Sequence, residues 1–95
     1  MNKHLVDFFD DELKNNDYYQ SIRKFAEGKE WKQILSAVVN EYDDRIDNFG
    51  PYRFMDAIED FLSKAYEEGD AEITDCEDLD EVISKMWEKD AFEQY

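Results

Sequence analysis

Carboxylates are the most abundant residues in this chain that could do chemistry. Asp and Glu number 26 against 11 Lys and Arg, which gives a formal net charge of −15 over 95 residues. The first 50 residues have a net charge of −4 and the remaining 45 a net charge of −11, and nine carboxylates lie between Ala65 and Ser84 with no basic residue. This charge density opposes compaction by self-repulsion and favours encounter with a basic surface.

Carboxylate oxygens are also ligands for calcium and magnesium. An EF-hand frame that begins at Asp70 places Glu72, Thr74 and Glu81 at ligand positions 3, 5 and 12. The same frame places Asp75 where the loop needs glycine for its turn. We therefore expect no specific metal site.

Residue types suited to catalysis are few. His4 is the only histidine, and Cys76, the only cysteine, lies between Asp75 and Glu77. Neighbouring anions oppose the thiolate, so we expect the pKa of this thiol to rise and its nucleophilicity to fall. The chain also lacks a glycine-rich phosphate loop. We expect no catalytic residue, no cofactor and no enzymatic activity.

Helices are the elements that must position the carboxylates. From Trp31 to Phe49 the apolar residues keep the i, i+3, i+4, i+7 spacing of an amphipathic helix. Similar stripes predict helices over about 3–14 and 51–68 and from about residue 78. A short helix between them is expected to begin after Asp17, as its N-cap, and to stop at Gly28.

The remaining segments are connections. Residues 70–77 form an acidic link, in which 72–74 are expected to be extended, and the tail is expected to fray or to dock through Phe92 and Tyr95. No period-two alternation indicates a sheet, and a composition of 42% hydrophobic and 16% aromatic residues suffices for a core. We predict an all-α fold, a compact bundle of four to five short helices in one acidic domain over 1–95.

The composition also bears on location. A single cysteine excludes an intramolecular disulfide, the N-terminal residues lack the apolar run of a signal peptide, and no segment approaches the roughly 18 apolar residues of a membrane span. We expect a cytoplasmic protein. Its acidity argues against direct binding to nucleic acid or to anionic membranes, both of which attract basic patches.

The predicted partner-binding surface is an array of carboxylates on the last two long helices and the link between them. Acids three and four residues apart share a helix face, and only Lys64 and Lys85 interrupt the array. A nearby tyrosine is included as an anchor. The predicted set is Asp56, Glu59, Asp60, Tyr66, Glu67, Glu68, Asp70, Glu72, Asp75, Glu77, Asp78 and Glu81.

In size, charge and acidic runs the chain resembles small inhibitor proteins of phages and mobile elements, the DNA-mimic antirestriction proteins and the anti-CRISPR proteins. The runs are 43–44, 67–70 and 75–81, although the chain lacks the strongly acidic tail that DNA mimics often have. The resemblance implies a monomer or homodimer in the host cytoplasm. It would occupy the basic nucleic-acid-binding site of a defence nuclease or CRISPR effector.

Three other interpretations stay open at this level. The chain is also similar to the immunity proteins of bacteriocin systems, which neutralise a cognate nuclease toxin by the same charge attraction. An acidic adaptor or regulator could offer a helical groove to a basic amphipathic peptide. A purely solvated surface would serve only solubility.

Overall fold

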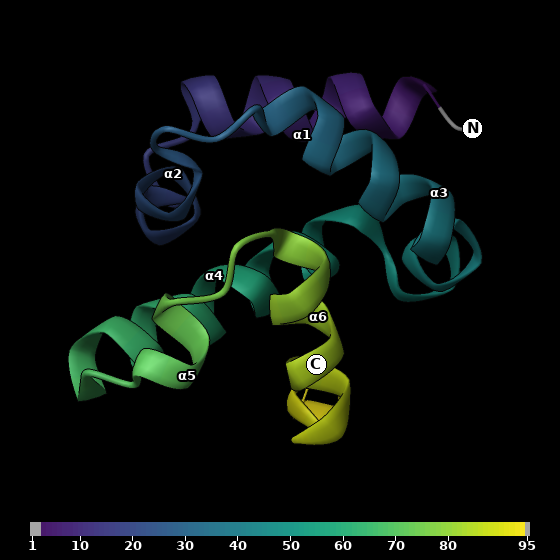
Figure 1. Cartoon of the computed structure of the whole chain (residues 1–95). Helices are drawn as coiled ribbons and strands as arrows, with labels where there is room; N and C mark the ends of the chain where they lie inside the picture. The colour runs from purple at the N-terminus through teal and green to yellow at the C-terminus, as the bar shows by residue number, and fades with distance from the viewer. Residues whose placement is uncertain (1–2, 95) are drawn as a thin grey trace.

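The structure, a computed structural model, describes the backbone of residues 3–94 and the side chains of residues 4–92. Over this part of the chain every regular element is helical, which confirms the all-α prediction (Figure 1). The elements are α1 (Lys3–Asn15), α2 (Gln20–Ala26), α3 (Trp31–Phe49), α4 (Pro51–Glu68), α5 (Ala71–Thr74), α6 (Leu79–Glu88) and the 3₁₀ helix η1 (Ala91–Gln94).

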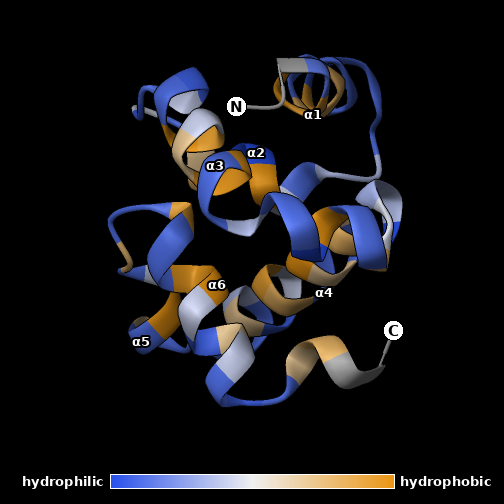
Figure 2. Ribbon diagram, turned by 90° about the vertical axis from the view of Figure 1, so that its right-hand side faces the viewer, coloured by the Kyte–Doolittle hydropathy of each residue, from blue (hydrophilic) through white to orange (hydrophobic). Residues whose placement is uncertain are grey.

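Helix α4 is the central element of the bundle. It packs against α2, α3, α5, α6 and η1, while α1 packs mainly on α3. Its apolar stripe faces inward, as Figure 2 shows, and Phe54, Ile58 and Leu62 are almost completely buried. Because several neighbours cover the apolar face of α4, the opposite face of this helix, which carries acids, must point away from the core.

Glycine and proline set the ends of α4 as the sequence predicts. Gly50 precedes the helix with φ of 103° and Pro51 occupies its first turn, where the missing N–H costs nothing. Gly69 closes the helix in the left-handed conformation at φ of 70°, a region that glycine adopts without strain. This sharp stop lets α5 turn back beside α4 (Figure 1).

Two local expectations are wrong. Residues 72–74 belong to the helical turn α5 instead of an extended piece, because the Asp70 side chain accepts a hydrogen bond from the Glu72 N–H and Ile73 is buried against the core. Asp17 does not cap α2. The N-cap is Tyr19, which makes no side-chain cap bond, and Asn16 instead accepts from the Tyr18 N–H.

The C-terminal tail docks through Phe92, which is 3% exposed. Its ring stacks on Phe54 with centroids 5.4 Å apart and contacts Trp87 at 4.2 Å. Tyr95, the other residue expected to dock, lies outside the described residues. None of the described helices is both long enough and apolar enough to cross a membrane.

Candidate functional site

Glu59, one of the predicted partner-binding acids, lies inside the bundle. Its residue is 6% exposed, and its carboxylate accepts hydrogen bonds at 3.0 Å from the backbone N–H groups of Ser21 and Ile22. These are first-turn donors of α2, which a helix leaves unsatisfied and which attract negative charge. Glu59 therefore caps α2 from another helix, and its assignment to a partner surface is wrong.

Asp56, which is half-buried, and Asp60, which is exposed, both accept hydrogen bonds from tyrosine hydroxyls. The Tyr19 hydroxyl donates to Asp56 Oδ1 at 2.8 Å, and the Tyr18 hydroxyl donates to Asp60 Oδ1 at 2.9 Å. The hydrogen bond to Asp60, followed by burial, raises the pKa of Tyr18 to about 12. These two acids thus fasten the segment before α2 to α4.

Three further members of the predicted set hold local structure. Asp70 caps α5, and Asp78 caps α6 by accepting from the Glu81 N–H at 3.0 Å. The ring of Tyr66 is half-buried beneath the Lys24 ammonium, 4.4 Å from its centroid. Burial raises the pKa of the Tyr66 phenol.

The exposed carboxylates gather where α4 ends, α5 turns and the chain enters α6. We name this region the acidic corner and define it as Glu67, Glu68, Glu72, Asp75 and Glu77, all of them exposed. Helices α4 and α5 lie side by side in Figure 1, and α6 contacts α4. Within the described side chains, no Lys or Arg nitrogen comes within 4.0 Å of the carboxylates of Glu67, Glu68, Asp75 or Glu77.

Glu72 is the neutralised member of the acidic corner. Lys85 Nζ lies 3.0 Å from its Oε1, and Lys89 Nζ lies 3.9 Å from its Oε2. The hydrogen bond from Lys85 holds the pKa of Glu72 below its usual value. Both lysines come from α6 and the turn after it, so tertiary packing and not i,i+4 pairing within one helix neutralises Glu72.

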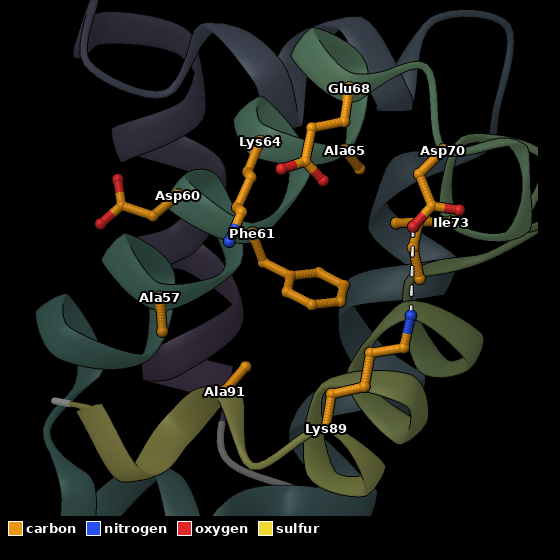
Figure 3. Close-up of a pocket in the computed structure, with 10 residues that line it drawn as sticks. All are labelled: Ala57, Asp60, Phe61, Lys64, Ala65, Glu68, Asp70, Ile73, Lys89 and Ala91. Carbon is orange, nitrogen blue, oxygen red and sulfur yellow. Dashed lines mark ion pairs between the residues drawn. The ribbon is translucent and has the colours of Figure 1, made fainter.

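A hollow of about 270 Å³ opens beside the acidic corner, between α4, α5 and the turn from α6 to η1 (Figure 3). Its apolar lining is Ala57, Phe61, Ala65, Ile73 and Ala91, and its charged lining is Asp60, Lys64, Glu68, Asp70 and Lys89. Figure 3 shows the Phe61 ring pointing into the hollow and Lys89 reaching Asp70, at 4.0 Å. Three of the predicted acids thus meet an apolar surface that sequence reasoning missed.

A second acidic feature, also missed from the sequence, joins α3 to α6. Glu41 and Asp80 share a side-chain hydrogen bond, which raises the pKa of Glu41 above its usual value. The Asp80 Oδ1 atom is buried, and none of the described groups hydrogen bonds to it. Both residues line a hollow of about 270 Å³ together with Asp78. Only the packing of α6 on α3 brings these acids together.

Cys76 is a buried structural thiol. Its Sγ donates to the Glu72 carbonyl at 3.3 Å, and burial, with the charge of Glu81, raises the pKa of the thiol as the sequence predicts. Over the described residues, no three His, Cys, Asp or Glu side chains are placed to hold a metal ion. Residues 71–74 of the EF-hand frame form a helical turn instead of a ligand loop.

The fold and the site define the class of protein as a small all-α bundle with an acidic corner beside a partly apolar hollow. Comparisons of the chain with protein-family models, with curated proteins and with solved structures found no match.

Proposed function

We propose that this protein is a small acidic inhibitor. It binds the basic nucleic-acid-binding surface of a bacterial defence nuclease or CRISPR effector and blocks that surface. The proposed place of action is the host cytoplasm. The observation that carries the proposal is the acidic corner, whose carboxylates at 67, 68, 75 and 77 are exposed and have no cation within 4.0 Å among the described side chains. Such a field accelerates encounter with positive charge.

The acidic corner is preorganised by the bundle. The Asp70 N–H donates to the Ala65 carbonyl at 2.9 Å, and Ile73, which is 1% exposed, fixes α5 to the core. A rigid display of charge loses little conformational entropy on binding, which favours affinity. The same charges on a flexible segment would bind less tightly because that segment would have to be ordered.

A nucleic-acid site is the target that suits this charge best. Duplex DNA carries one negative charge per about 1.7 Å of its axis, so a protein that binds it must concentrate Lys and Arg in one cleft. Nearby bases partly neutralise Glu72 and Asp70 and leave the other carboxylates of the corner available. Repulsion among these unpaired acids would be relieved in the complex.

The test is inhibition of DNA cleavage by a panel of RNA-guided nucleases and restriction endonucleases. The variant E67Q/E68Q/D75N/E77Q removes four charges from the acidic corner. The matched control, D7N/D11N/D44N/D47N, removes four exposed charges from α1 and α3. We expect the corner variant to associate about tenfold or more slowly at low salt, since steering of this kind raises on-rates by about 10 to 10³.

Substrate DNA added before the inhibitor should compete with it, and higher salt should weaken inhibition because the Debye length falls from about 10 Å at 0.1 M to about 3 Å at 1 M. Equal inhibition by the wild type and the corner variant would refute the proposal. An equal loss in the two variants would show that only total charge matters and would also refute it. So would a panel in which no nuclease is inhibited.

A further inference from the structure

The hollow beside the acidic corner differs from the rest of this surface because its floor is apolar. Phe61 is only partly buried: it packs against the edge of the core, and its ring projects into the hollow (Figure 3). Ala57 and Ala65 line the α4 wall, Ile73 lines the α5 wall, and Ala91 points in from η1. The alanines of α4 and η1 thus leave room beside one partly exposed aromatic ring.

The dimensions of the hollow suit a single side chain. Its volume of about 270 Å³ lies below the range of about 300–1,000 Å³ that is usual for pockets of whole small-molecule ligands. An apolar side chain from a partner would cover the Phe61 ring and remove both surfaces from water. Interfaces owe much of their affinity to such anchors in desolvated pockets, with charged groups around them.

The charged rim indicates what should flank the anchor. Lys89 is held by Asp70 at 4.0 Å and by Glu72 at 3.9 Å, so its charge is largely matched within this chain. Lys64 also lines the hollow, but the lining holds three acids, Asp60, Glu68 and Asp70, against two lysines, and the acidic corner adds the exposed carboxylates of Glu67 and Asp75. An apolar residue that enters here would therefore carry its neighbours into a negative field, which favours lysine and arginine beside it.

We infer that the hollow lined by Phe61 and Ala91 is the anchor pocket for one aliphatic side chain in a basic segment of the partner protein. The inference rests on the proposed function and deepens it by naming the chemistry of the contacting segment. The acidic corner accelerates encounter, and the anchor pocket slows dissociation.

Short peptides test the pocket without any nuclease. The probes are Ac-Arg-Arg-Leu-Arg-Arg-NH₂, the same peptide with glycine in place of leucine, and Ac-Ser-Ser-Leu-Ser-Ser-NH₂. Each is titrated into the isotopically labelled full chain while the methyl signals of Ala57, Ala65, Ile73 and Ala91 are followed by NMR. We expect the basic leucine peptide to bind about tenfold or more tightly than either other peptide, because burying a leucine side chain adds a substantial apolar contribution.

The variant Ala91→Leu occupies the part of the hollow beside Phe61 from its partly exposed edge and should reduce the affinity of the leucine peptide toward that of the glycine peptide. Asn40→Leu places a leucine at an exposed site on α3 that lines neither hollow and should change nothing. The wild-type methyl shifts give a readout that does not depend on either variant folding.

Equal binding of the leucine and glycine peptides, or unmoved methyl signals, would overturn the inference. Equally tight binding of the uncharged leucine peptide would overturn the basic flank. Concentration-dependent dimerisation that Ala91→Leu abolishes would assign the hollow to a second copy of the chain and overturn it as well. Peptide binding with no nuclease inhibited would support the pocket and refute only the proposed function. Nuclease inhibition without peptide binding would refute only the pocket.

Discussion

Replacing Glu59 by alanine should destabilise this bundle more than replacing any exposed acid. The carboxylate of Glu59 lies 3.0 Å from the N–H groups of both Ser21 and Ile22, and the N-cap residue Tyr19 offers no side-chain acceptor in its place. In Glu59→Ala both donors lose their partner in a largely buried site. The substitution is therefore a test of whether α2 is held on α4 by a cap that belongs to another helix.

The cost follows from the burial of the two donors. A buried donor left unsatisfied costs about 1–3 kcal/mol. Ile22 is 1% exposed, so we assign its N–H about 2 kcal/mol, and Ser21 is partly open to water, so we assign about 1 kcal/mol. The total of about 3 kcal/mol corresponds to a fall in Tm of about 12–24 °C for a domain of this size. Both 3.0 Å bonds end on Oε1, an acceptor that Glu59→Gln can keep, so this variant should be less destabilised than Glu59→Ala.

Urea unfolding followed by circular dichroism in 0.15 M salt measures the effect, with thermal unfolding as a second readout. The matched control is Glu67→Gln, which removes an equal charge from an exposed position on α4 and should stay within about 0.5 kcal/mol of the wild type. Hydrogen exchange should show the largest loss of protection in α2. A Glu59→Ala protein within about 0.5 kcal/mol of the wild type would refute the capping role.

Two further predictions concern titration. The pKa of Glu41 is raised by its hydrogen bond with Asp80, so the folded state holds this proton more tightly than the unfolded chain does. The stability that the protonated Glu41 carboxyl contributes is present below the pKa of this group in the unfolded chain. It is lost as the pH rises through the higher pKa of the group in the folded state. Asp80→Asn should therefore flatten the decline in urea midpoint as the pH rises above the ordinary Glu pKa of about 4.3, whereas an unchanged profile, or equal flattening by Asp44→Asn, would contradict this. Asp60→Asn should lower the pKa of Tyr18 from about 12 toward its ordinary value near 10, because the phenol loses its anionic acceptor. Absorbance of the phenolate would show the change, and a Tyr18 titration that does not move would count against the hydrogen bond.

Local signals in the sequence predict most of the helices because they act within a few residues. Apolar spacing places α3 and α4, and Gly50, Pro51 and Gly69 place the ends of α4 through their backbone preferences. The same reasoning fails at 72–74, where the burial of Ile73 and the cap from Asp70 stabilise a single helical turn. An isolated turn of this length is too short to be recognised by its period.

Helical periodicity also gave the wrong position for one acid. Glu59 and Glu67 are both acids of α4, yet Glu59 is buried and Glu67 is exposed. The difference arises because α2 packs against one flank of the helix and presents bare N–H groups there. A single-helix projection contains no information about which neighbour covers that flank.

The sequence by itself determined the helical class, most element boundaries and the excess of negative charge after Pro51, since composition, periodicity and turn residues act locally. Only the tertiary structure decided how each carboxylate is used. Packing of helices distant in sequence made Glu59 a cap, placed Glu41 against Asp80, and left Glu68 at a partly apolar hollow. The energy of a charge depends on its solvent exposure and its partners, and both are set by contacts between elements.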